Sequence, residues 1–212
     1  LSGLGQQARS WTGLVHAAQK EQHMQIREAT REDAAAIAHI YNQGIEDRAA
    51  TLETLLRTPE ERAEWLASRG PRHPVLVAVD SAVEREVRAT NGSESADAQC
   101  PQAPAEGAGV VVGWGSLNPF NPRPVYDHVA DFSVYVAREQ RGQGIGDALL
   151  GALEKRARGL GYHKMVLAAL PTNAPGMRLY ERHGFQTVGV YHEQGLLDGR
   201  WVDVIIMEKL LK

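Results

Sequence analysis

Apolar positions recur at two different spacings along this chain, and the two alternate. Short runs rich in Val, Ile and Leu predict buried strands, and apolar residues three or four positions apart predict amphipathic helices. The predicted strands cover residues 25–29, 75–79, 110–117, 132–136, 164–169, 185–191 and 201–210. The predicted helices cover residues 33–41, 58–68, 147–160 and 176–183. Because strands alternate with helices and the last strands follow one another, the pattern predicts an α/β (α+β) fold with a mixed central sheet and helices on both faces.

Local signals mark several of the predicted helix ends. Thr30 and Asp33 form an S/T-x-x-D/E cap before the first helix. The sequence TPEE at residues 58–61 supplies an N-cap, a proline at the first helical position and two acidic residues. Gly161 and Gly184 follow the third and fourth helices, as expected for glycine just past a helix C-terminus.

Two segments differ from the rest of the chain. Residues 1–23 are rich in Gln, Gly and Ala, and Met24 is followed at once by a predicted strand. We interpret residues 1–23 as an upstream extension or a cloning remnant, without the apolar core of a signal peptide, and residues 24–212 as one domain. Residues 81–109 carry Ser, Ala, Glu, Pro and Gly without periodicity, which indicates a flexible insertion in the loop between two paired strands.

Composition excludes several classes of function. The net charge of −3 gives no general affinity for nucleic acid, and no apolar run approaches the ~20 residues of a membrane span. The one cysteine, Cys100, rules out an intrachain disulfide and fits a reducing cytoplasm. His128, His163, His183 and His192 show no metal-like spacing, so we expect no metal.

The segment FSVYVAREQRGQGIG at residues 132–146 carries the clearest chemical signal. An apolar run ends in a polar stretch, three glycines follow, and an amphipathic helical pattern begins. Free backbone N–H groups at a helix start bind anions, and glycine lets the backbone approach a phosphate closely. Neither the P-loop pattern nor the G-x-G-x-x-G dinucleotide pattern is present. The alternative is a glycine-rich turn without a ligand.

The pattern R-G-x-G-x-G at residues 141–146 resembles the acetyl-CoA pyrophosphate loop of the GCN5-related N-acetyltransferases. The stretch NAPGMRLYERHGF at residues 173–185 is similar to a second motif of that superfamily. YDHVADFSVYV at 126–136, GRWVDV at 199–204 and YNQGIEDRAATLET at 41–54 resemble the phosphinothricin acetyltransferase group. That group includes enzymes that acetylate arsinothricin and methionine sulfoximine. The resemblance covers residues 25–211 apart from the insertion, and it implies a single domain of this superfamily's fold.

The resemblance implies acetyl-CoA as co-substrate. The glycine loop would hold the pyrophosphate, the preceding strand would hydrogen-bond the pantetheine arm, and the amide of Val134 or its neighbour would polarise the thioester carbonyl. The residues implied in cofactor binding are Val134, Tyr135, Val136, Arg141, Gly142, Gln143, Gly144, Ile145, Gly146 and Asn173. For Asn173 the alternative role is a helix cap.

The resemblance further implies transfer of acetyl to a primary amine, whose ammonium form must lose a proton before it attacks. Asp131 occupies the position where phosphinothricin acetyltransferases carry a glutamate, just before the strand at 132–136. We expect it to act as the base, directly or through a water, and the alternative is a structural carboxylate. Tyr180 matches the residue that protonates or hydrogen-bonds the departing thiolate, and the alternative is a core aromatic residue.

On the acceptor side, Leu52, Arg123 and Tyr126 are the candidate substrate-binding residues. A guanidinium in the loop before the catalytic strand suits an amino-acid carboxylate or phosphinate, although a solvated loop arginine is equally consistent with the sequence. Leu52 replaces a frequent phenylalanine, and Leu197 stands where many members carry lysine. Because both changes alter the expected amine pocket, the identity of the acceptor amine stays undetermined.

Members of the group are commonly homodimers, which suggests the same for this chain. Glu193, Trp201 and Asp203 are candidates to shape the site from the last hairpin, either within one subunit or across a dimer interface. The acceptor could instead be a peptide N-terminus or a polyamine, and a non-catalytic acyl-CoA sensor would keep the glycine loop without needing Asp131 and Tyr180.

Overall fold

The computed structural model describes residues 23–82 and 109–212. One compact unit comprises residues 26–78 and 111–212, and a second comprises residues 1–25 and 79–110. In the described part of the second unit, the Ser81 N–H donates to the carbonyl of His23 at 3.1 Å. Nearly all of the predicted extension and insertion lie outside the described residues.

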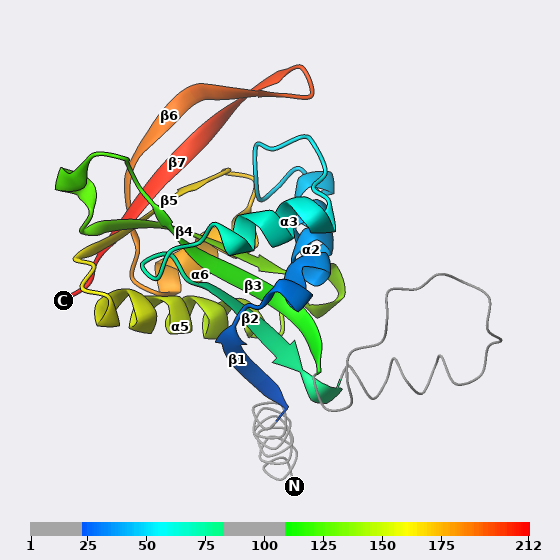
Figure 1. Ribbon diagram of the computed structural model, residues 1–212. Coiled ribbons are helices and arrows are strands. Elements are labelled where there is room, and N and C mark those ends of the chain that lie inside the picture. The colour runs from blue at the N-terminus through cyan, green and yellow to red at the C-terminus, as the bar shows by residue number, and fades with distance from the viewer. Residues whose placement is uncertain (1–22, 83–108) are drawn as a thin grey trace, which may run out of the picture. The chain divides into compact units, whose positions relative to one another are not determined.

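The sheet has seven strands in the order β1-β2-β3-β4-β5-β7-β6 (Figure 1). The strands are β1 Met24–Glu28, β2 Val75–Asp80, β3 Val110–Pro119, β4 Val129–Val136, β5 Lys164–Ala169, β6 Gln186–Leu197 and β7 Arg200–Leu210. β4 and β5 run parallel, whereas the pairs β3/β4, β5/β7 and β6/β7 are antiparallel, which confirms the predicted mixed sheet. β2 and β3 are neighbours, as predicted.

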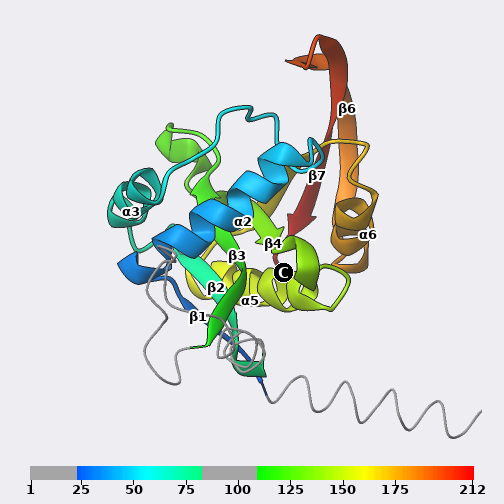
Figure 2. The same ribbon diagram turned by 90° about the vertical axis from the view of Figure 1, so that its right-hand side faces the viewer.

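Four α-helices lie in the described part of the chain: α2 Ala34–Glu46, α3 Pro59–Ala67, α5 Ile145–Gly159 and α6 Ala174–Arg182. Short 3-10 turns span Arg31–Asp33, Pro124–Tyr126 and Arg138–Gln140. Two views at right angles place α2 and α3 on one side of the sheet and α5 on the other, confirming helices on both faces (Figures 1 and 2).

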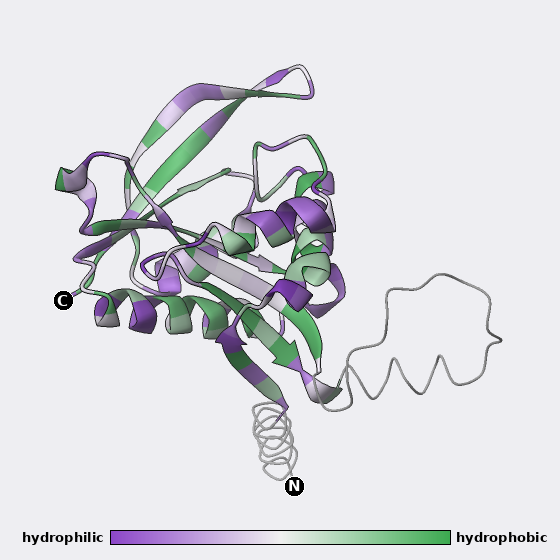
Figure 3. Cartoon of the chain, in the orientation of Figure 1, coloured by the Kyte–Doolittle hydropathy of each residue, from purple (hydrophilic) through white to green (hydrophobic). Residues whose placement is uncertain are grey.

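Alternation along β3 explains how both faces are covered. Trp114 points toward α2 and α3, where its ring lies 5.9 Å from that of Tyr41 and 5.7 Å from that of Trp65. Gly113 and Gly115 face α5, and a Cβ at either position would meet Leu149 at 3.1 Å or Leu153 at 2.9 Å. The two glycines therefore let the apolar face of α5 lie close to the sheet, and the hydropathy colouring shows this helix alternating between apolar and polar positions (Figure 3).

The local signals read from the sequence hold. Thr30 and Asp33 form a capping box, with the Thr30 N–H donating to the Asp33 carboxylate at 2.7 Å. Thr58 caps α3 through a second capping box with Glu61. Gly161 follows α5 with a φ of 77°, and Gly184 follows α6 with a φ of 80°, the left-handed conformation that ends a helix.

Some boundaries differ from the prediction. α5 begins at Ile145, inside the glycine motif, because Gly144 takes the N-cap position. β4 begins at Val129, so Asp131 lies within the strand and not before it. β6 extends to Leu197, beyond the predicted end at residue 191. The prediction stopped early because the outer half of this strand is exposed and lacks an apolar pattern. Within residues 23–82 and 109–212, no helix is long and apolar enough to cross a membrane.

Candidate active site

The sheet opens between β4 and β5. Their ladder covers only Val129–Asp131 against Lys164–Val166, although β4 continues to Val136 and β5 to Ala169. Asp131 therefore stands at the last paired position, where the two strands begin to diverge. Beyond it, β4 keeps its antiparallel partner β3 on one edge only.

The free edge of β4 has its hydrogen-bonding groups at defined positions. The Ala137 N–H donates to the Val112 carbonyl at 2.9 Å, so Ala137 turns its polar groups toward β3. Because these groups alternate along a strand, those of Val134 and Val136 face the gap toward β5. An extended ligand in the gap could pair with them as an added strand would.

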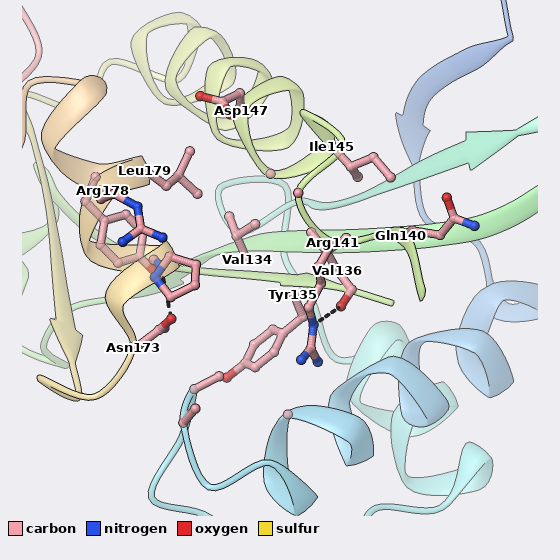
Figure 4. A pocket seen from close by; sticks show the side chains of 18 of the residues that line it. Val134, Tyr135, Val136, Gln140, Arg141, Ile145, Asp147, Asn173, Arg178 and Leu179 are labelled. Carbon is pink, nitrogen blue, oxygen red and sulfur yellow. Dashed lines mark hydrogen bonds between the residues drawn. The ribbon is translucent and has the colours of Figure 1, made fainter. Parts of the chain in front are cut away.

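A pocket of about 560 Å³ lies at this gap (Figure 4). The end of β4, the glycine loop, the end of α2 and the start of α6 form its walls. Ten predicted site residues line it: Val134, Tyr135, Val136, Arg141, Gly142, Gly144, Ile145, Gly146, Asn173 and Tyr180. Five others do not: Leu52, Arg123, Tyr126, Asp131 and Gln143.

The glycine loop has the conformation expected of an anion site. Gly142 and Gly144 have φ values of 73° and 85°, which a residue with a Cβ rarely adopts. The first backbone bond of α5 runs from the Ala148 N–H to the Gly144 carbonyl. The amides of residues 145–147 consequently lack an acceptor within the helix and are available to a phosphate.

The Arg141 side chain forms an ion pair with Asp47, which follows α2. Its Nη1 lies 2.5 Å from Oδ2 of Asp47, and its Nε donates to the Val136 carbonyl at 3.2 Å. Arg138 also binds Asp47, at 2.8 Å. Burial alone would raise the pKa of Asp47, but the bonds from the two arginines outweigh it, and the pKa lies below its ordinary value of 3.8. Much of the Arg141 charge is thus already neutralised.

Asn173 is the N-cap of α6. Its Oδ1 accepts a hydrogen bond from the Gly176 N–H at 3.0 Å, so it plays the capping role raised above as the alternative. A Cβ on Gly176 would lie within 2.9 Å of three Asn173 side-chain atoms, and glycine therefore permits the cap. The Asn173 side chain also lines the pocket (Figure 4).

Asp131 lies in a mainly polar surrounding on the α2 and α3 face of the sheet. The Asn118 amide donates to Asp131 Oδ1 and to Ser133 Oγ, both at 3.3 Å. Asn118 Oδ1 in turn accepts bonds from Arg69 at 2.9 Å and from Ser116 at 3.0 Å. Burial raises the pKa of Asp131 to about 6 despite the bond from Asn118. A carboxyl with this pKa is ionised yet appreciably basic near neutral pH.

Tyr180 lies on the other face of the sheet from Asp131, near the point where β4 and β5 separate. Its ring packs on Phe132 at 5.9 Å and on Phe185 at 6.3 Å. Phe132 follows Asp131 in the strand, so the two side chains point to opposite faces. Burial, and secondarily the charge of Asp131, raise the pKa of Tyr180 to about 12. Tyr180 therefore stays protonated throughout the physiological range and can donate a hydrogen bond into the pocket.

The predicted acceptor residues lie apart from the pocket. Arg123 is exposed, and Tyr126 packs against Phe120 at 5.6 Å. Leu52 is 39% exposed and lies against Gly195, where an added Cβ would meet it at 3.0 Å. The described structure brings none of the three into contact with Asp131.

Sequence reasoning also missed several residues of the pocket. The end of α2 and the residues after it contribute Gly44, Asp47, Ala49 and Ala50. The segment around α6 contributes Thr172, Pro175, Gly176, Arg178, Leu179 and Arg182. Gln140 and Asp147 flank the glycine loop. The spacing of Arg178 and Arg182 on one helix face was a readable signal. The stretch at 41–54, which contains Asp47, matched the family pattern, but nothing in it indicated that Asp47 would bind Arg141. Within the described residues, no cluster of three or more His, Cys, Asp or Glu is arranged to hold a metal.

Comparison with known proteins agrees with this geometry. Residues 56–185 match the model of the acetyltransferase (GNAT) family. An L-methionine sulfoximine/L-methionine sulfone acetyltransferase of Pseudomonas aeruginosa is 31% identical over 86% of this chain and 92% of its own. A phosphinothricin acetyltransferase from Sinorhizobium meliloti, solved in complex with acetyl-CoA, is 25% identical, with a TM-score of 0.73 over 89% of both chains. A ribosomal-protein-alanine N-acetyltransferase from Brucella melitensis is 32% identical, with a TM-score of 0.71 over 88% of this chain and 99% of its own.

The divided sheet, the anion loop and the pocket between them define an acyl-CoA-dependent acyltransferase fold. The chain belongs to the GNAT family of N-acetyltransferases, as a single α/β domain of that fold.

Proposed function

We propose that this protein transfers acetyl from acetyl-CoA to the primary amine of a small amino-acid-like acceptor of the phosphinothricin, methionine sulfoximine or arsinothricin type. The observation that carries the proposal is the position of Asp131, a carboxyl with a pKa raised to about 6 at the point where β4 and β5 separate. The names of the P. aeruginosa and S. meliloti relatives support the acceptor class.

The residues present fit acetyl-CoA. The unpaired amides of residues 145–147 suit the pyrophosphate. The edge of β4 at Val134 and Val136, where only the Val136 carbonyl already accepts a bond from Arg141, suits the amide-containing pantetheine arm. When bound, acetyl-CoA supplies an activated acyl group and a thiol leaving group. The proposed role of the Val134 N–H is a hydrogen bond to the thioester oxygen, where negative charge would develop.

Asp131 is the proposed base. It accepts a proton from the acceptor ammonium, directly or through a water held near Asn118 and Ser133, and so creates a neutral amine. The amine nitrogen would then bond to the acetyl carbon as the carbon–sulfur bond breaks, and the second proton lost by the nitrogen would end on the departing sulfur, giving the amide and the free thiol. Tyr180 donates a hydrogen bond to the departing sulfur. Because its pKa of about 12 lies well above the ~8.5 of an ordinary thiol, hydrogen bonding contributes more than complete proton transfer.

Arg123 remains the proposed partner of an acceptor carboxylate or phosphinate, and Tyr126 and Leu52 remain proposed acceptor-binding residues. Within the described residues the Arg123 guanidinium has no ion-pair or hydrogen-bond partner, so its charge is available. Engagement of the acceptor would require the loop at 120–126 to approach Asp131.

The function is tested by acetyl-CoA turnover, with released thiol as readout, across a panel of amines. The panel contains phosphinothricin, methionine sulfoximine, arsinothricin, polyamines and short peptides. Preference for the first three supports the proposal. Preference for a peptide beginning with alanine would favour the second candidate, to which the B. melitensis relative points by name. Acetyl-CoA binding without turnover on any amine would indicate a sensor.

We further propose a homodimer formed through the β6–β7 hairpin. This hairpin exposes Tyr191, Leu196 and Trp201, which are 56%, 59% and 63% accessible. Several exposed large apolar side chains on one hairpin are typical of an interface. Light scattering of the wild type and of Trp201→Ser tests it: a dimer that dissociates in the variant supports the interface, and a wild-type monomer refutes it.

A further inference from the structure

The charges that line the pocket are unevenly compensated. Arg141 is paired with Asp47, and Arg182 is paired with Asp147 through contacts of 2.8 and 3.0 Å. Arg178 is the remaining pocket-lining arginine. Within residues 23–82 and 109–212 its guanidinium has neither a hydrogen-bond nor an ion-pair partner. The pocket therefore presents one uncompensated positive charge, on α6.

The position of Arg178 on α6 separates it from the reacting end of the pocket. Residues four apart share a helix face, so Arg178 lies one turn before Arg182, on the face that meets Asp147 of α5. Tyr180 is two positions away, about 200° around the helix, and packs against Phe132. Arg178 thus lines the pocket from the face of α6 that meets the start of α5 (Figure 4). Tyr180 lies on a different face of α6, against Phe132.

Coenzyme A carries two separate phosphate groups, a pyrophosphate and a 3′-phosphate on the ribose. The glycine loop offers its amides to one of them. A second anionic group on the same ligand needs a cation elsewhere in the pocket, and a guanidinium fork binds phosphate oxygens in pairs.

We propose that Arg178 binds the 3′-phosphate of coenzyme A and so distinguishes it from its dephosphorylated form. This inference rests on the proposed use of acetyl-CoA. It adds a specificity-determining residue to the cofactor site and gives Arg178 no part in the chemical step.

Calorimetric titration with CoA and with dephospho-CoA, which lacks only the 3′-phosphate, tests the inference. Wild-type protein should bind CoA more tightly. Arg178→Gln should weaken CoA binding roughly three- to tenfold and leave dephospho-CoA binding unchanged. Arg178→Lys should recover part of the loss, and the difference should shrink at high salt. Arg31→Gln, which removes an exposed charge outside the pocket, is the matched control.

Equal weakening toward both ligands would assign Arg178 to the pyrophosphate and overturn the inference. Unchanged binding of both would show that Arg178 does not contact the cofactor and would also overturn it. The proposed function fails separately, if the wild type binds neither ligand.

Discussion

Replacing Asp131 by asparagine should abolish most of the activity and make the protein more stable at neutral pH. The carboxyl is largely buried, and its pKa of about 6 exceeds the ordinary value of 3.8. Below pH 3.8 it is protonated in both the folded and the unfolded chain. As pH rises toward 6, the unfolded chain loses this proton first, so the folded state is progressively disfavoured, and above pH 6 the cost is constant.

The size of the effect follows from the pKa difference. A gap between 3.8 and about 6, at about 1.4 kcal/mol for each pKa unit, corresponds to about 3 kcal/mol of lost stability above pH 6. Asparagine has the same shape, carries no charge and can still accept the hydrogen bond from Asn118. Asp131→Asn should therefore raise the free energy of unfolding by up to about 3 kcal/mol at pH 8 and hardly change it at pH 4.

Urea unfolding at pH 4 and pH 8 measures this difference, and thiol release measures turnover. Asp127→Asn, an exposed carboxyl nearby, is the control and should affect neither quantity strongly. A stability difference between wild type and Asp131→Asn that is the same at both pH values would show that the buried charge is not its cause. Unchanged turnover would remove Asp131 from the mechanism, where we expect a loss of ~10²-fold or more.

Three other predictions concern the same site. The kcat/KM for the amine should fall about tenfold per pH unit below pH 6, because Asp131 must be ionised to accept a proton, and this limb should vanish in the residual activity of Asp131→Asn. Tyr180→Phe should lower kcat with little change in the acetyl-CoA Kd; a change in Kd alone would instead indicate a binding role. Gly144→Ala should cost about 1 kcal/mol and weaken CoA binding, because its φ is 85°, whereas Gly151→Ala, in the interior of α5 where an added Cβ would meet only His183 at 4.0 Å, should stabilise by up to about 1 kcal/mol. Thermal unfolding and CoA titration of the two glycine variants check the last statement.

The cofactor wall of the pocket could be predicted because its signals are local. The strand, the loop and the start of α5 occupy one continuous segment, in which glycine conformation and helix capping depend on near neighbours. The properties of Asp131 could not be predicted in this way. Its basicity depends on burial and on Asn118, a strand neighbour 13 positions earlier that only the pairing of β3 with β4 brings near.

The contacts made by the residues just after α2 join parts of the chain that are still more distant in sequence. Asp47 binds Arg141 of the glycine loop across 94 positions, and its neighbour Arg48 binds Asp198 of the β6–β7 hairpin across 150. Two adjacent residues just after α2 thus tie the cofactor loop to the hairpin, and Leu52, a few positions later, lies against Gly195 of the same hairpin. No short motif encodes such an arrangement, because each partner is an ordinary charged residue in its own surroundings. The sequence alone therefore could not show that the end of α2, the glycine loop and the β6–β7 hairpin are joined by ion pairs.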